Sequence, residues 1–229
     1  LSEFKPQELA NTAWAFARLG ERSPVFFAQI ADHARGLLPR FKAQEMVNLA
    51  WAFATVRISA PALFEAVACE AASRTGDFNS QELGNLAWAY AKADFAAPRL
   101  FAALSEEAAP RLSEFKPQEL ANTAWAFARL GERSPVFFAQ IADHARGLLP
   151  RFKAQEMVNL AWAFATVRIS APALFEAVAC EAASRTGDFN SQELGNLAWA
   201  YAKADFAAPR LFAALSEEAA PRLSEFKPQ

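Results

Sequence analysis

The sequence has 229 residues, of which 53% are hydrophobic and 21% are charged, and its formal net charge is −2. This balance fits a packed soluble chain and excludes disorder, and no apolar run approaches the roughly 20 residues that a membrane-spanning helix needs. The near-neutral charge also departs from the basic bias that is typical of nucleic-acid-binding domains.

The sequence repeats on two length scales. Residues 1–111 recur letter for letter as residues 112–222, which either a recent duplication or deliberate concatenation would produce. Within each block the tryptophans recur every 37 residues, at Trp14, Trp51, Trp88, Trp125, Trp162 and Trp199. We therefore predict a single array of six repeats, namely 1–37, 38–74, 75–111, 112–148, 149–185 and 186–222, with 223–229 as the start of a truncated seventh. The first residue is not Met, which is consistent with a piece of a longer array.

The first helix of each repeat is predicted from its start signals. In the first repeat Pro6 occupies the first helical position, Lys5 precedes it at the cap position, and Gly20 ends the helix. In the third repeat Asn79 is a better cap, and Glu82 three residues later completes a capping box.

The second helix of the first repeat is predicted to start with Ser23 as cap and Pro24 at the first helical position. Gly36 and Pro39 are expected to close it, as Pro110 does in the third repeat. No segment shows strand alternation. The fold is therefore predicted to be all-α, an α-solenoid of six helix–turn–helix repeats, with a right-handed superhelix expected.

A helical wheel sorts the first helix into faces. Leu9, Ala13 and Phe16 form the stripe against the second helix. Small residues flank that stripe, including Ala10 and Ala17, so successive first helices can approach closely.

The face opposite the core stripe carries an unusual set of side chains: an amide, a second amide, a tryptophan and then Arg, Thr or Lys. Each amide offers a base edge both a donor and an acceptor, and modular helical-repeat proteins read about one base per repeat. We take this face as the candidate RNA-binding site, made of Gln7, Asn11, Arg18, Gln44, Asn48, Thr55, Gln81, Asn85, Lys92, Gln118, Asn122, Arg129, Gln155, Asn159, Thr166, Gln192, Asn196 and Lys203.

Three of these side-chain types have a structural alternative. Asn11 and its copies can instead bond the backbone of a neighbouring repeat, and Trp14 can stack on a base or pack against the next repeat. Arg18 and Lys92 can hold phosphates, which position a strand without reading it.

Residues that are identical in every repeat cannot discriminate between bases, so a code would lie where the repeats differ. Four such positions are candidates, and they carry Lys5/Lys42/Asn79, Ala10/Val47/Gly84, Thr12/Leu49/Leu86 and Arg18/Thr55/Lys92.

Residues suited to catalysis or metal binding are scarce. Cys69 and Cys180 lie in apolar stretches and are expected to be buried, reduced thiols. Asp32 and His33 are adjacent, so they point about 100° apart on a helix and do not form a dyad; His144 is the copy of His33. We expect no catalytic activity, no metal and no cofactor.

The string Gln-Glu-Leu-Ala-Asn-Thr-Ala-Trp-Ala-Phe-Ala at 7–17, with close variants at 44–54 and 81–91, resembles the octotricopeptide and heptatricopeptide repeat families. The same signature is similar to that of FAST-kinase-like proteins and RNA-editing substrate-binding complex proteins. The 37-residue period is closer to the heptatricopeptide form. The resemblance implies a protein of mitochondria or chloroplasts that binds single-stranded RNA. The RAP domain that often accompanies such arrays is absent from this sequence, and so is any basic bias.

The leading hypothesis is therefore a modular single-stranded RNA-binding protein acting in organellar RNA metabolism. The alternatives are a protein–protein interaction scaffold and an engineered array without a ligand. Neither end of the sequence carries an atypical polar cap, so head-to-tail self-stacking of copies is also predicted.

Overall fold

The computed structural model describes residues 3–225, and within them it contains twelve α-helices and six short 3₁₀ segments. This described part of the chain contains no strand, and the predicted all-α solenoid of helical hairpins is confirmed. The chain divides into two compact units, Leu1–Arg111 and Leu112–Gln229, whose boundary coincides with that of the two identical blocks.

Unit 1 consists of three helical hairpins. Its α-helices are α1 (Pro6–Leu19), α2 (Pro24–Arg35), α3 (Ala43–Val56), α4 (Pro61–Ala72), α5 (Ser80–Ala93) and α6 (Pro98–Ala108). The 3₁₀ segments that follow its second helices are η1 (Leu38–Arg40), η2 (Thr75–Asp77) and η3 (Ala109–Glu114). These segments were not predicted, and they place Pro39 and Pro110 inside a short helical turn.

Unit 2 repeats the same three hairpins. Its α-helices are α7 (Pro117–Arg129), α8 (Pro135–Arg146), α9 (Ala154–Val167), α10 (Pro172–Ala183), α11 (Ser191–Lys203) and α12 (Pro209–Ala219). Its 3₁₀ segments are η4 (Leu149–Arg151), η5 (Thr186–Asp188) and η6 (Ala220–Glu225). The truncated seventh repeat lies outside the described residues from position 226 onward.

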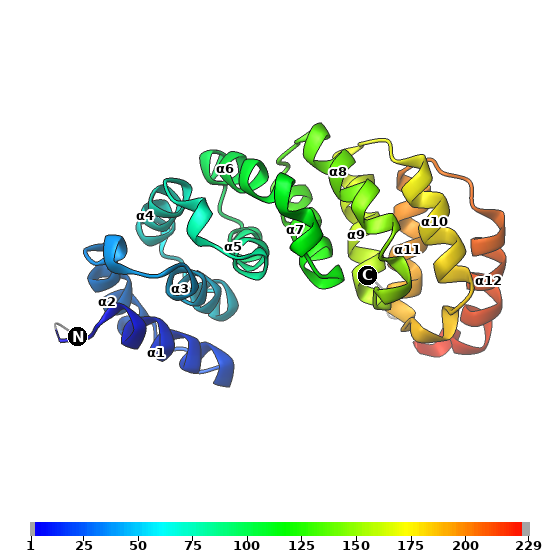
Figure 1. Cartoon of the computed structure of the whole chain (residues 1–229). Helices are drawn as coiled ribbons and strands as arrows, with labels where there is room; N and C mark the ends of the chain where they lie inside the picture. The colour runs from blue at the N-terminus through cyan, green and yellow to red at the C-terminus, as the bar shows by residue number, and fades with distance from the viewer. Residues whose placement is uncertain (1–2, 226–229) are drawn as a thin grey trace. The chain divides into compact units, whose positions relative to one another are not determined.

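The helices of each unit form two layers (Figure 1). In unit 1 the first helix of each hairpin packs on the first helix of the next, α1 on α3 and α3 on α5, and the second helices pack in the same order. In unit 2 the layers are α7, α9 and α11 against α8, α10 and α12. Within each unit, every repeat therefore contacts its sequence neighbours, as expected of a solenoid.

The first helices begin as predicted. The Asn79 side chain accepts a hydrogen bond from the backbone N–H of Glu82 at 2.9 Å, and the Glu82 carboxylate accepts one from the N–H of Asn79 at 2.9 Å. In the first repeat only the second of these bonds forms, from the Lys5 N–H to the Glu8 carboxylate at 2.8 Å, because a Lys side chain has no acceptor.

The first helices end in a left-handed residue. Gly20 has φ +74°, which glycine adopts without steric cost. Arg57 and Asp94 hold the same position in the next two repeats with φ +56° and +55°. The second helices start at their prolines as predicted, but Ser23 makes no side-chain capping bond to α2.

The core lies between the two layers. Leu9 and Ala13 are fully buried, and the equivalents of Phe16 in the inner repeats, Phe53 and Tyr90, are fully buried too. The Tyr90 hydroxyl donates a 2.7 Å hydrogen bond to the carbonyl oxygen of Phe64 on α4, as Tyr201 does to Phe175 in unit 2.

The two flanks of a first helix contact different neighbours. In α1 Ala10 and Ala17 are buried whereas Leu19 is 78% exposed. In α11 the pattern reverses, since Gly195 and Ala202 are exposed whereas Leu197 is fully buried. One flank therefore packs on the following first helix and the other on the preceding one.

Two of the three repeats in each unit carry an arginine clamp. Arg74 ends the second repeat and donates a hydrogen bond from Nη2 to the carbonyl oxygen of Phe41 near the start of the same repeat. Its Nε lies 3.2 Å from Glu70 Oε1, as an ion pair without hydrogen-bond alignment. The other clamps are Arg111 with Phe78 and Glu107, Arg185 with Phe152 and Glu181, and Arg222 with Phe189 and Glu218. Leu37 and Leu148 stand at this position in the first repeat of each unit, which lacks the clamp.

Candidate nucleic-acid interface

The glutamines of the predicted site are the most regular feature of the first-helix layer. Each lies in the first turn of its helix, and all six are exposed: Gln7, Gln44, Gln81, Gln118, Gln155 and Gln192. Because α1, α3 and α5 pack side by side, unit 1 presents three such amides in a row, and unit 2 presents three more. The sequence prediction that this face points to solvent is correct for these positions.

The second amide of each helix lies one turn further along and is less accessible. Asn11 is exposed, whereas its five copies Asn48, Asn85, Asn122, Asn159 and Asn196 are half-buried. Among residues 3–225 none of these side chains hydrogen-bonds to the backbone of a neighbouring repeat. The amides therefore keep their donors and acceptors available, which disfavours a purely structural role.

The tryptophans lie between the amides and the helix ends. The Trp14 and Trp51 rings have centroids 6.4 Å apart at 35°, and Trp125 and Trp162 repeat this geometry in unit 2. Trp14 is nevertheless 43% exposed. Trp14 and Trp125 thus pack on the tryptophan of the next repeat, and Trp14 still offers part of its ring to a ligand.

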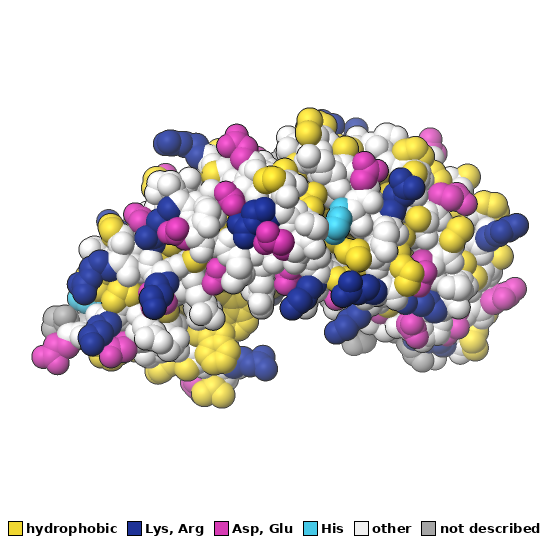
Figure 2. Space-filling model, viewed as in Figure 1, with side chains coloured by type: hydrophobic (Ala, Val, Ile, Leu, Met, Phe, Trp, Pro, Cys, Tyr) yellow, Lys and Arg dark blue, Asp and Glu magenta, His cyan; other side chains and the backbone are white. Residues whose placement is uncertain are grey.

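The last turn of the candidate face differs between repeats. Arg18, Lys92, Arg129 and Lys203 are exposed, and the Lys92 ammonium lies 5.9 Å from the centroid of Trp88. Thr55 and Thr166 are half-buried, and their hydroxyl oxygens are buried without a hydrogen-bond partner. Cations and carboxylates are interspersed over the face shown in Figure 2, in keeping with the net charge of −2.

The structure contradicts two of the four candidate code positions, in which every residue but the half-buried Thr12 is buried. Ala10 and Val47 are 0% and 4% exposed, and Gly84 is buried with them; Leu49 and Leu86 are fully buried. They occupy the flanks by which neighbouring first helices contact each other, so they cannot reach a base. The positions that remain accessible carry Lys5/Lys42/Asn79 at the caps and Arg18 and Lys92 at the last turn, where the hydroxyl oxygen of Thr55 is buried.

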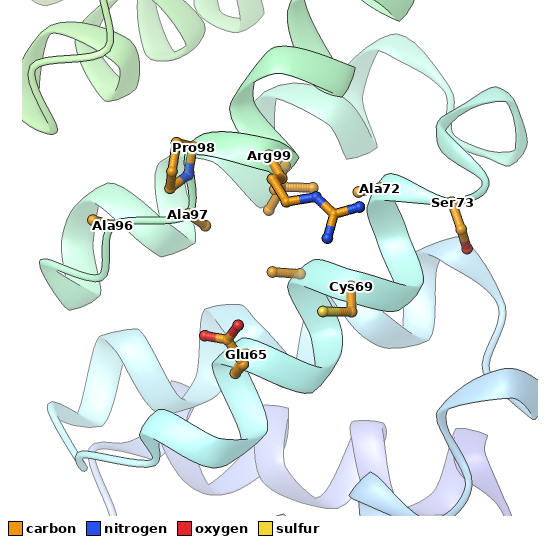
Figure 3. A pocket seen from close by; sticks show the side chains of 10 residues that line it. Glu65, Cys69, Ala72, Ser73, Ala96, Ala97, Pro98 and Arg99 are labelled. Atoms are coloured by element: carbon orange, nitrogen blue, oxygen red, sulfur yellow. The ribbon is translucent and has the colours of Figure 1, made fainter.

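The prediction that the cysteines are buried is also wrong. Cys69 and Cys180 are free and exposed. Cys69 lies with Glu65 on α4 in a pocket of about 330 Å³ whose other side is formed by α6, with the Arg99 guanidinium facing it (Figure 3). The apolar core of α4 is made by Leu63, Val67 and Ala71, and the helical turn directs Cys69 away from that face.

His33 and Asp32 are adjacent in α2 but have different surroundings. Asp32 pairs with Arg35 at 3.7 Å, and His33 Nε2 is buried without a hydrogen-bond partner. Within the described residues, no group of three or more His, Cys, Asp or Glu side chains is placed to hold a metal ion. Over the same residues, every helix is too short or too polar to cross a membrane.

A pocket that sequence reasoning missed lies at one end of the first-helix layer. In unit 1 it measures about 290 Å³ and is lined by the ends of α3 and α5 and the start of α4, including Arg57, Ile58, Phe64, Lys92 and Phe95. Its copy in unit 2 measures about 270 Å³ and contains Arg168 and Lys203. One feature of the sequence could have indicated this pocket: Arg57 stands at the position where the first repeat has Gly20.

Comparison with known proteins adds one finding to this geometry. No curated protein matches the chain. A family model described as RNA-editing substrate-binding complex 6 protein matches residues 1–225. Because the match spans all of the described array, the chain belongs to the RNA-editing substrate-binding complex 6 protein family.

Proposed function

We propose that this protein binds single-stranded RNA along its first-helix layer, with about one base per repeat, as part of RNA processing. The observation that carries the proposal is the row of exposed glutamines, three in each unit, that continues into partly exposed tryptophans. An amide can pair with a base edge and an indole can stack on a base, and the two together suit unpaired RNA.

The family supports the same conclusion. Its name refers to a complex that binds the substrate of RNA editing, and we extend substrate binding to this chain. We further propose that the repeats are of the heptatricopeptide type, given their 37-residue period. This class implies an organellar site of action.

We propose binding without catalysis. The candidate face holds amides, indoles, hydroxyls and cations, and the two histidines lie on the second helices α2 and α8. None of these groups forms an acid–base pair on the first-helix layer. Incubation of RNA with the protein, with and without Mg²⁺, should leave the strand intact on a denaturing gel, and cleavage that follows the protein through purification would refute this.

The test of the binding face uses labelled pools of single-stranded RNA and fluorescence anisotropy. The variant Gln44→Ala/Gln155→Ala removes one exposed amide from each unit. If each amide contributes a net hydrogen bond of about 0.5–1.5 kcal/mol, the pair contributes about 1–3 kcal/mol, and the Kd should rise roughly 5- to 150-fold. Replacing all six glutamines should abolish binding.

The control variant is Gln29→Ala/Gln140→Ala, which removes the same side chains from exposed positions on α2 and α8. It should keep the wild-type Kd, and circular dichroism should show that both variants stay folded. Equal affinities for the two variants would show that the glutamines of the first-helix layer do not contact RNA.

A protein partner is the second candidate, favoured by the near-neutral charge and by the largely apolar pockets between α4 and α6 and between α10 and α12. A peptide docked there would bind with little salt dependence, whereas RNA binding weakens steeply with salt. Absence of RNA binding at about 50 mM salt would favour this candidate. Head-to-tail stacking of copies stays a prediction, for which light scattering at rising concentration should show growing mass.

A further inference from the structure

The pocket at the ends of α3 and α5 brings two cations together. Arg57 follows the last turn of α3, and Lys92 lies in the last turn of α5, so residues of adjacent repeats face the same space. Both side chains are exposed, and among residues 3–225 no carboxylate forms an ion pair with either of them. Two like charges beside one pocket repel each other unless an anion lies between them.

The two cations reach the pocket from different positions at the helix ends. Cations in the last turn of a helix are stabilised by the helix dipole, which is sufficient to explain Lys92. Arg57, however, has φ +56°, a left-handed conformation that costs a side-chain-bearing residue roughly 1 kcal/mol and costs glycine nothing. The first repeat has Gly20 here and the third has Asp94 with φ +55°, so of the three repeats in unit 1 the second is the one that places a cation at this position.

The cation pair occurs at one junction in each unit. Between the first and second repeats the equivalent positions are Gly20 and Thr55, which carry no charge. Between the second and third repeats they are Arg57 and Lys92, and unit 2 repeats the pair as Arg168 and Lys203.

The pocket continues the candidate RNA-binding face. Lys92 is at once a lining residue of the pocket and the cation over Trp88, with its ammonium 5.9 Å from the ring centroid. A strand that stacks a base on Trp88 would bring its backbone to Lys92. Local pairs of cations also reconcile RNA binding with a net charge of −2, because affinity depends on the phosphates that are neutralised rather than on the total charge.

We propose that each of these two pockets binds one backbone phosphate of single-stranded RNA between an arginine and a lysine of adjacent repeats. This inference rests on the proposed function and adds to it the residue Arg57, the copy Arg168, and the position of the phosphodiester. The chemistry recognised is a phosphate oxyanion, for which arginine and lysine are the usual partners.

The test compares two variants of the full chain that each lose four positive charges. The pocket variant is Arg57→Gln/Lys92→Gln/Arg168→Gln/Lys203→Gln. The matched control is Arg40→Gln/Arg99→Gln/Arg151→Gln/Arg210→Gln, whose arginines are exposed and lie on η1, α6, η4 and α12. The Kd for a labelled uridine 12-mer is measured at several salt concentrations, and thermal melting checks the fold.

Neutralising one phosphate of a single strand contributes about 0.7 to the slope of log K against log salt concentration, so two pockets contribute about 1.4. The pocket variant should therefore bind more weakly with a slope that is shallower by about 1.4, and the control should keep the wild-type slope. Equal slopes for the two variants, with wild-type binding intact, would overturn the phosphate pockets alone. A wild-type protein that does not bind the 12-mer at all would overturn the proposed function as well.

Free phosphate is the other source of the same oxyanion. If the pockets hold backbone phosphates, inorganic phosphate that replaces chloride at matched ionic strength should compete with the uridine 12-mer and weaken wild-type binding more than pocket-variant binding. If the wild type and the pocket variant bind the 12-mer equally in chloride and only the wild type binds inorganic phosphate, the pockets bind the free ion, and the assignment to the RNA backbone is wrong.

Discussion

The variant Arg74→Leu tests whether the arginine clamp holds a repeat together. Arg74 joins the end of the second repeat to its beginning through the carbonyl oxygen of Phe41, a contact between residues 33 positions apart. A hydrogen bond from a charged donor contributes about 1.5–3 kcal/mol when its loss leaves the acceptor without a partner. The ion pair with Glu70 is about one-quarter exposed, and such a pair adds about 0.2–1 kcal/mol.

The expected loss is therefore about 2–3 kcal/mol of the free energy of unfolding of unit 1, since leucine can still pack its apolar part as Leu37 does in the first repeat. Urea unfolding followed by circular dichroism should show a midpoint lower by about 1 M for a slope of about 2 kcal/mol/M. Unit 2 keeps Arg185 and should unfold as in the wild type.

The control for this prediction is Arg40→Leu, which removes an exposed arginine of η1 and should change the stability by less than about 0.5 kcal/mol. The reciprocal variant, His33→Glu/Leu37→Arg, installs the missing clamp in the first repeat and should raise its stability. If Arg74→Leu unfolds at the same urea concentration as Arg40→Leu, the clamp contributes nothing and the reasoning fails.

Three further predictions concern the buried tyrosines, a cap and the thiols. Burial raises the pKa of Tyr90 and Tyr201 above 10, so the folded state keeps protons that the unfolded state loses. The free energy of unfolding therefore falls as the pH rises above about 10. In the variant Tyr90→Phe/Tyr201→Phe, the urea midpoint should fall less between pH 8 and pH 11 than it does in the wild type. Asn79→Ala removes the side-chain half of the α5 capping box and should cost about 1 kcal/mol by urea unfolding, whereas Asn79→Asp should cost much less. Cys69 and Cys180 are exposed, so both thiols should react with a disulfide reagent in the native protein. If the two thiols of the chain react only after denaturation, the structure is contradicted.

Much of the fold follows from local signals in the sequence. Pro24 at a helix start, Gly20 at a helix end and the Asn79 capping box each act within one turn of backbone, and the structure confirms all three positions. The exposed row that begins with Gln7 follows from helical periodicity, because the core stripe fixes the opposite face.

The errors share a physical cause, since they depend on contacts between helices. A helical wheel gives the angle of Leu49 but not the distance to the neighbouring first helix, and that distance decides whether the side chain is buried. The apolar sequence neighbours of Cys69 predict burial, although adjacent residues on a helix point about 100° apart and Cys69 is exposed. The cation pair of Arg57 and Lys92 spans two repeats and becomes visible only when their helix ends are brought together.

The letter-for-letter identity of the two blocks has a consequence for the ligand. If each repeat selects one base, an accessible position that differs between repeats, such as the one carrying Lys5, Lys42 and Asn79, presents the same three preferences twice. The preferred target would then be a trinucleotide microsatellite, and selection from a random library should enrich sequences with a period of three. On a long repetitive transcript such a protein could shift by three nucleotides and bind in an equivalent register. It would therefore distribute along the repetitive tract and would not bind at a single site.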